Sequence, residues 1–225
     1  MAFEFTKPRF LICEGFDDKG FLEALVANRP ALPEFQILHA AECNDKKQGG
    51  RSGFRLSLDS SIRTFAGFGQ LKAFLIVSDN DTANSFREVQ DEIRAAGHIP
   101  PPDANSVGDI LGKPVAVYMV PNINTFGDLE TLSLPTIYKT WPKARICVPM
   151  FLRCTGALKY FGGAKWPKPS SVSKARARAA SVGFNKDDPY KGIGRLFQSG
   201  TLSAGHSCFD EMATFLNNFD AFCGI

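Results

Sequence analysis

The segment AFLIVSDND at residues 73–81 decides the fold of this chain, because it joins a long apolar run to two acidic residues. Two other segments repeat its apolar character, RFLIC at residues 9–13 and VAVYMV at residues 115–120. Near-continuous runs of branched and aromatic side chains are typical of strands buried on both faces of a parallel sheet. The three runs therefore predict the centre of an α/β fold.

Acidic residues follow each of these runs. Glu14 and Asp18 come after the first run, Asp79 and Asp81 after the second, and Glu130, in the segment GDLE at residues 127–130, after the third. In open α/β sheets, ligands bind beyond the carboxyl ends of the strands. We therefore expect these side chains to meet at one edge of the sheet.

A cluster of carboxylates at that edge needs compensating positive charge. Two carboxylates about 4 Å apart repel by roughly 4 kcal/mol at an effective dielectric constant near 20, so such a group shares protons or binds cations. Oxygen ligands select hard ions, and Mg²⁺ or Mn²⁺ is the natural choice. The sequence thus predicts a metal site with the ligands Glu14, Asp18, Asp79, Asp81 and Glu130.

Most of these residues also have a structural interpretation. Glu14 could serve as a helix cap, and either Asp79 or Asp81 could cap the helix expected directly after them. Asp17 could cap the first helix and leave Asp18 solvated. The sequence alone leaves these alternatives open.

The alternation of strand and helix patterns predicts an α/β fold of about four mostly parallel strands flanked by helices. We expect this metal-binding domain in residues 1–135 and a basic helical extension, packed on it, in residues 136–225. Strands are expected at residues 9–13, 35–40, 73–78 and 115–120. Helices are expected from about residue 17 to 28 and at residues 58–68, 82–96, 145–158, 172–182 and 208–222, with an exposed loop at residues 44–53.

Positive charge is concentrated in one part of the chain. Residues 139–195 contain 13 Lys and Arg against two acidic residues, a net charge of +11, whereas the rest has 13 basic and 21 acidic residues, a net charge of −8. Such a distribution suits a polyanionic substrate. Lys174, Arg176 and Arg178 could place a cation opposite a scissile phosphate, although they could equally form a solvated helix face. We expect nucleic acid to bind at Lys165, Lys168, Lys174, Arg176 and Arg178.

Composition limits the remaining possibilities. The longest apolar runs are far shorter than the roughly 20 residues that span a bilayer, and no signal peptide is recognisable, so we expect a cytoplasmic protein without a membrane partner. The six cysteines form no C-x-x-C pair, which favours buried thiols over zinc ligands. His39 could support a metal ligand or serve as a structural histidine.

Residues 9 to about 135 resemble a Toprim domain, the catalytic module of type IA and type II topoisomerases, bacterial primases, small ribonucleases and OLD-family nucleases. The resemblance lies in Glu14 with Gly15 at the end of the first strand, and in Asp79 and Asp81 at the end of a later one. Asp18, four residues after Glu14, is similar to the OLD-type variant. The resemblance implies a Toprim-like, Rossmann-type sheet.

Two further segments extend the resemblance over most of the chain. The pattern PN-x₄-G-x-LE at residues 121–130 and the pattern DP-x-K-x-IG at residues 188–194 are similar to a family of stand-alone bacterial and archaeal Toprim-like proteins without assigned activity. We expect neither the tyrosine domain of topoisomerases, for which these 225 residues leave no room, nor the zinc module of primases, for which they carry no Cys/His signature. The resemblance therefore implies metal-dependent phosphodiester hydrolysis of DNA or RNA, with Glu14, Asp79, Asp81 and Lys174 as catalytic residues.

Two other functions compete with a nuclease. The chain could be a catalytically silent subunit that binds metal and nucleic acid within a larger assembly, beside a partner ATPase as Toprim modules often are. It could also be a phosphatase or nucleotidyl enzyme, because Asp79-Asn80-Asp81-Thr82 is similar to the D-x-D-x-T nucleophile motif. In that motif, however, the threonine comes one position later.

Overall fold

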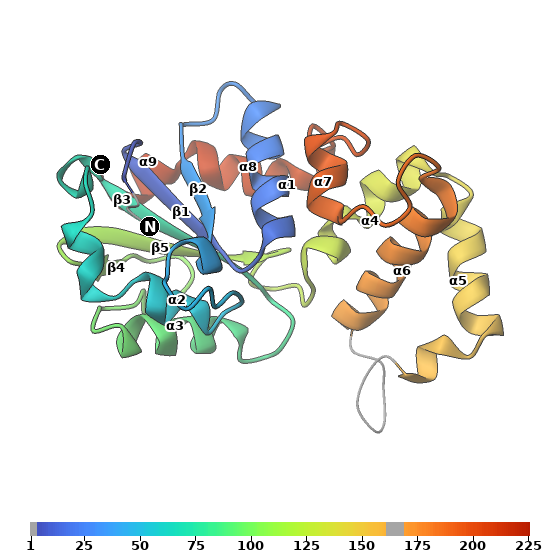
Figure 1. Ribbon diagram of the computed structural model, residues 1–225, viewed down its shortest axis with the longest axis horizontal. Helices are drawn as coiled ribbons and strands as arrows, with labels where there is room; N and C mark the ends of the chain where they lie inside the picture. The colour runs from blue at the N-terminus through green and yellow to red at the C-terminus, as the bar shows by residue number, and fades with distance from the viewer. Residues whose placement is uncertain (1–3, 161–168) are drawn as a thin grey trace.

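The computed structural model describes residues 4–160 and 169–225, and its centre is one mixed sheet (Figure 1). The strand order is β2-β1-β3-β5-β4. The parallel strands are β1 (Arg9–Cys13), β2 (Gln36–His39), β3 (Ala73–Asp79) and β5 (Lys113–Val120), and β4 (Gly108–Ile110) runs antiparallel to β5. The expected α/β class with a mostly parallel sheet is confirmed. The fifth strand, β4, was not expected, because its three residues form no apolar run.

The apolar runs fill both faces of the sheet. On β3, Phe74 and Ile76 point to one face and Leu75 and Val77 to the other, and all four are buried. Each face belongs to a separate hydrophobic cluster. This double burial explains why the strands are continuously apolar and do not alternate with polar residues.

Helices cover the two faces unequally. The cluster on the Leu75 face includes side chains of α1, α7, α8 and α9, whereas the cluster on the Phe74 face includes side chains of α2 and α3 (Figure 1). The bounds are α1 (Phe16–Ala27), α2 (Gly53–Ser57), α3 (Ser85–Ala95), α7 (Ile193–Gln198), α8 (Asp210–Asn217) and α9 (Phe219–Cys223). Short 3₁₀ helices lie at η1 (Ala40–Glu42), η2 (Ser60–Thr64), η3 (Phe68–Gln70), η4 (Ala157–Tyr160) and η5 (Ser207–Phe209).

The helices α4 (Leu129–Thr140), α5 (Ala144–Cys154) and α6 (Pro169–Phe184) pack together beside the sheet and its covering helices (Figure 1). Pro135 lies inside α4, so the expected domain boundary at residue 135 falls within a helix. The later helices α7, α8 and α9 return to the sheet. The division into two domains stays a prediction.

Several expected helices differ from those in the structure. Within the helix expected at residues 58–68 the structure has the short helix η2, while α2 ends just before this segment and η3 begins at its last residue. The helix expected at residues 208–222 is divided into η5, α8 and α9, with a break at Asn218. The short helix α7 was not expected at all. Segments this short carry too few turns for a clear helical period.

The expectation that the cysteines are buried is wrong for two of them. All six cysteines are free thiols, and Cys147 and Cys154 on α5 are exposed. The helix buries Ala144, Val148 and Leu152, which lie four residues apart on one face, and the two thiols fall outside that face. In the described part of the chain, no helix is long and apolar enough to span a bilayer.

Replacing Gly194 with alanine should destabilise the close packing between α1 and α7. A Cβ atom at Gly194 would lie 2.4 Å from the carbonyl oxygen of Asp17, which is well inside van der Waals contact. We expect Gly194→Ala to lower the free energy of unfolding by about 1–3 kcal/mol in urea titrations. The matched Gly183→Ala in α6, where a Cβ atom meets no neighbour within 4 Å, should raise it by about 0.5–1 kcal/mol. Equal effects of the two substitutions would contradict this account.

Candidate functional site

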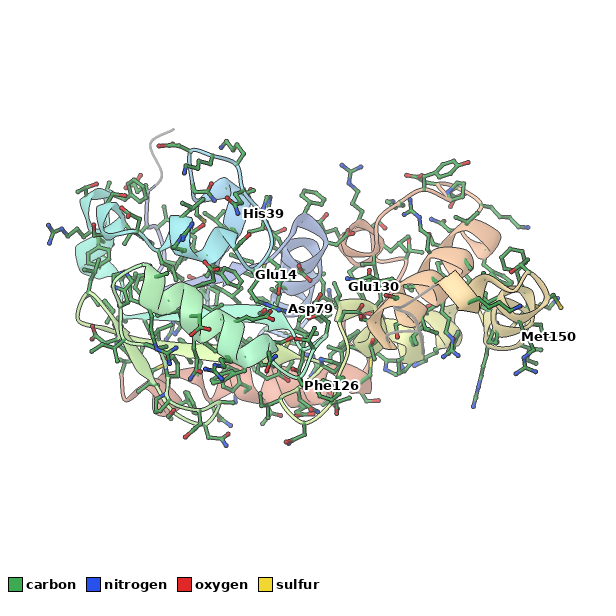
Figure 2. The ribbon with its side chains drawn as sticks, turned by 90° about the horizontal axis from the view of Figure 1, so that it is seen from below. Glu14, His39, Asp79, Phe126, Glu130 and Met150 are labelled. Carbon is green, nitrogen blue, oxygen red and sulfur yellow. The ribbon has the colours of Figure 1, made fainter. Side chains whose placement is uncertain are left out.

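The carboxyl edge of the sheet gathers acidic side chains from separate elements. Glu14 follows β1 directly, Asp79 is the last residue of β3, and Asp18 lies in the first turn of α1. Glu14 and Asp79 lie close together in Figure 2, and an Oε1 atom of Glu14 accepts a hydrogen bond from the backbone amide of Asp79 at 3.1 Å. Parallel strands that end side by side thus bring together residues distant in sequence, as expected.

Asp79 links three elements of the fold. Its Oδ1 atom accepts a hydrogen bond from the backbone amide of Leu129 in α4 at 3.3 Å, and its Oδ2 atom lies 3.8 Å from Nζ of Lys174 in α6. Burial, together with the charges of Asp18 and Glu14, raises the pKa of Asp79 to about 9. Without an added cation, Asp79 therefore holds a proton at neutral pH.

Asp18 and Glu130 flank this centre. Asp18 accepts a hydrogen bond from the backbone amide of Gly15 at 2.9 Å, and burial, with the charge of Glu14, raises its pKa to about 7. Glu130, in the first turn of α4, also has its pKa raised to about 7 by burial and by the charge of Asp128. If all of these acids were ionised, the site would hold more negative charge than its surroundings compensate, so some of them retain protons.

Asp128 is a buried acid that the sequence did not mark as a site residue. It is the N-cap residue of α4, and its Oδ1 atom accepts hydrogen bonds from the backbone amide and the hydroxyl of Thr131 at 2.8 and 2.7 Å. Its buried Oδ2 atom has no hydrogen-bond partner and lies 3.6 Å from Nζ of Lys174. An acid placed directly before a helix predicts an N-cap, whereas nothing in the sequence predicts that Lys174 lies close to Asp128.

Arg51 is a second residue that the sequence did not mark. It lies in the segment expected to be an exposed loop, yet its side chain is only 15% exposed and reaches the site. Its Nη2 atom lies 3.0 Å from Oδ1 of Asp81 and 3.5 Å from Oε1 of Glu14, and Nη1 pairs with Glu88. Its Nε atom donates to Oγ of Ser78, which in turn donates to Glu14. No local pattern marks such a residue, because its partners lie far away in sequence.

Arg51 pairs with Asp81 and thereby sets its charge state. Although burial raises it, hydrogen bonds from Arg51 and Ser85 hold the pKa of Asp81 below its usual value. Asp81 is therefore ionised and already paired. The suggestion that Asp79 or Asp81 caps the next helix is wrong, because α3 begins at Ser85 and its N-cap residue is Asn84.

Removing the guanidinium of Arg51 should cost substantial stability. The substitution Arg51→Met keeps most of the side-chain volume but leaves Glu14 and Asp81 without the cation that they share. We expect the free energy of unfolding to fall by about 2–4 kcal/mol at pH 7. Arg55→Met, at an exposed position of α2, should change it by no more than about 0.5 kcal/mol. If both variants unfold at the same urea concentration, Arg51 does not hold the site together.

Of the five basic residues expected to bind nucleic acid, the structure describes three, and they lie in different surroundings. Lys174 contacts the carboxylates, and although burial opposes its charge, Glu130 and Asp79 raise its pKa. Arg178 donates a hydrogen bond to the backbone carbonyl of Tyr190 at 3.4 Å, and the buried Nε atom of Arg176 has no hydrogen-bond partner. Outside the described residues lie Lys165 and Lys168. Lys174 is therefore the expected cation that the structure brings to the cluster.

Asp17 and His39 have partners of their own in the structure. Asp17 does not cap α1, whose N-cap residue is Gly15. Instead, its Oδ1 atom accepts a hydrogen bond from the backbone amide of Gly194 at 2.9 Å. His39 lies 3.8 Å from Glu42 through Nε2 and packs edge-on against Phe16. Asp17 thus joins α1 to α7, and His39 packs beside the start of α1.

A hard divalent cation fits the donor chemistry of the site. The donors are oxygen atoms, the carboxylates retain protons because their ionised forms lack compensating positive charge, and one buried oxygen of Asp128 has no hydrogen-bond partner. Within residues 4–160 and 169–225, however, no three His, Cys, Asp or Glu side chains are grouped so that they could hold an ion as they stand. Ligation would require the side chains of Glu14, Asp18 and Asp79 to turn toward one point.

Fold and site together define an α/β protein with a carboxylate cluster at the carboxyl edge of a mostly parallel sheet. Residues 8–220 match the model of a family described as "Protein of unknown function (DUF3226)", and the chain belongs to this family. The match includes both the sheet and the helices that follow it. Comparisons with curated proteins and with solved structures give no significant match.

Proposed function

We propose that this protein is a Toprim-like nuclease that hydrolyses phosphodiester bonds of DNA or RNA with the help of Mg²⁺ or Mn²⁺. One observation carries the proposal. Glu14 at the end of β1 and Asp18 in the first turn of α1 lie close enough to Asp79, at the end of β3, to raise its pKa, and Lys174 lies beside Asp79. A cation at that point would relieve the repulsion between these carboxylates.

Glu14, Asp18 and Asp79 are the proposed metal ligands, with Glu130 as a neighbouring acid. A bound divalent ion would supply an activated water and stabilise charge on a phosphoryl oxygen. Lys174 would neutralise the phosphate, because its side chain is half exposed and its Nζ atom already lies beside the cluster. The excess of basic residues between positions 139 and 195 would attract the polyanionic strand.

For Asp81 the contacts favour a positioning role over ligation. Arg51 bridges Asp81 and Glu14 and donates to the backbone carbonyl of Asp79 at 2.8 Å. Asp81 would therefore hold Arg51, and Arg51 would hold Glu14, in the orientation that catalysis needs. In this proposal Asp81 touches neither the ion nor the substrate.

A silent binding subunit is the second candidate. The observation in its favour is that Arg51 already forms ion pairs with Glu14 and Asp81, and that Nζ of Lys174 already lies within 4 Å of Asp79 and Asp128. Such pairing could support nucleic-acid binding without hydrolysis, beside a catalytic partner such as an ATPase. Salt-sensitive DNA or RNA binding without cleavage would favour this candidate.

Hydrolysis assays decide between these candidates. Purified protein should cleave at least one of plasmid DNA, single-stranded DNA or RNA in Mn²⁺ or Mg²⁺, and EDTA should abolish cleavage. If all three substrates remain intact at every metal concentration while the protein still binds them, the silent subunit replaces the nuclease. If the protein neither cleaves nor binds them, both proposals fail.

A further inference from the structure

A small cavity of about 60 Å³ lies beside the carboxylate cluster. Its walls come from α4, α6 and α7 and from the first turn of α1, and it shares Glu130 and Lys174 with the cluster. Arg178 and Lys191 add two further cations to its lining. Neither Arg178 nor Lys191 forms an ion pair with the proposed metal ligands Glu14, Asp18 and Asp79. The proposed metal site therefore does not explain why these two cations line the cavity.

A buried hydroxyl group in this cavity lacks a partner. Ser181 is 3% exposed, lines the cavity, and its buried Oγ atom makes no hydrogen bond. Leaving a buried polar group unpaired is unfavourable, and a serine in a helix often avoids this by bonding to a backbone carbonyl of the preceding turn. A ligand with acceptor oxygens would satisfy this hydroxyl.

Charge and size define the ligand. Three cations, Lys174, Arg178 and Lys191, line the cavity against the carboxylates of Asp17 and Glu130, and one oxygen of Asp17 is occupied by the backbone amide of Gly194. The volume corresponds to about four water-sized positions. That space suits the four oxygens of a tetrahedral oxoanion and is too small for a sugar or a base.

We propose that this cavity is a binding subsite for the phosphomonoester group at the end of a nucleic-acid strand. A phosphate within a strand has chain leaving it on both sides, whereas a terminal phosphate needs an entry for one chain only. Because several helices wall the cavity, it leaves little room for a second chain to depart, and this favours a terminal phosphate. The choice of a nucleic-acid end as the source of the phosphate rests on the proposed nuclease function, but the binding of phosphate does not.

Calorimetric titration with inorganic phosphate in EDTA tests the subsite without any turnover. Wild-type protein should bind phosphate, and Lys191→Gln should weaken binding at least about tenfold, because one charge-assisted hydrogen bond is lost. Ser181→Ala should also weaken it, whereas Lys186→Gln, at an exposed position five residues before Lys191, should not. Thermal unfolding of each variant verifies that it is folded. Absence of phosphate binding, or equal binding by wild type and Lys191→Gln, would overturn the proposal.

Short oligonucleotides identify the source of the phosphate. In EDTA, an oligonucleotide with a 5′- or a 3′-phosphate should bind more tightly than the same sequence with hydroxyl ends, and Lys191→Gln should remove the difference. If inorganic phosphate binds but end phosphorylation has no effect, the subsite does not serve strand ends and the proposal fails. Because divalent ions are absent, these outcomes are independent of whether the protein hydrolyses nucleic acid.

Discussion

The free energy of unfolding of the metal-free protein should fall as the pH rises from about 5 to 8. The pKa values of Asp18 and Glu130 are raised to about 7 and that of Asp79 to about 9, from ordinary values of 3.8 and 4.5. Between these limits the native protein keeps protons that the unfolded chain has released, so a rise in pH favours unfolding. The stabilisation is complete below about pH 4 and is lost as the pH passes the native pKa values.

The expected slope is large for a chain of this size. Each proton that only the native state retains contributes about 1.4 kcal/mol per pH unit. Mutual coupling among the three groups reduces their sum, so we expect a slope of about 1–3 kcal/mol per pH unit near pH 6. Urea titrations in EDTA at pH 5, 6, 7 and 8 measure it directly.

Addition of Mg²⁺ should flatten or reverse this dependence. An ion that binds the ionised carboxylates stabilises only the native state, and it binds more tightly as those carboxylates lose their protons. The gain in stability caused by Mg²⁺ should therefore increase from pH 5 to pH 8. A stability that rises with pH in EDTA, or a Mg²⁺ effect that does not depend on pH, would contradict this interpretation of the cluster.

Asp79→Asn should separate activity from stability. The amide cannot ligate a hard cation as a carboxylate does, and we expect hydrolysis to fall at least about 100-fold. At pH 8 the same substitution should stabilise the metal-free protein, because folding then no longer has to protonate an acid that is ionised in the unfolded chain. The amide oxygen can still accept the hydrogen bond from Leu129.

The matched control is Asp45→Asn, at an exposed position in the loop after η1. It should leave the rate of cleavage unchanged, and it should change the free energy of unfolding by no more than about 0.5 kcal/mol. If Asp79→Asn cleaves nucleic acid at the wild-type rate, Asp79 is not part of the catalytic site. If the variant is instead less stable than wild type at pH 8, the pKa of Asp79 is not raised by its neighbours.

The sheet was largely predictable because its strands are buried on both faces. Apolar runs such as residues 73–78 carry the strand signal within themselves, and β1, β3 and β5 lie where the runs predict them. The short strand β4 has a single buried residue, Ile110, so it has no pattern to recognise. Its position depends on pairing with β5, which only the folded chain shows.

Site residues at the ends of strands could be predicted from the sequence. Site residues that reach the cluster through long side chains from other elements could not. The grouping of Glu14 and Asp79 follows from parallel strands that end at one edge. Arg51 crosses from a loop to reach Asp81, and Lys174 reaches the buried oxygen of Asp128 from α6. Such approaches depend on tertiary packing and leave no spacing pattern in the sequence.

Calorimetric titration with Mn²⁺ at pH 7 tests the central claim, that the carboxylate cluster binds a divalent cation. Wild-type protein should bind Mn²⁺ and release protons as it does so, which is measured by repeating the titration in buffers of different ionisation enthalpy. Asp79→Asn should weaken binding at least about tenfold, and Asp45→Asn should leave it unchanged. Absence of Mn²⁺ binding, or equal binding by wild type and Asp79→Asn, would contradict the account.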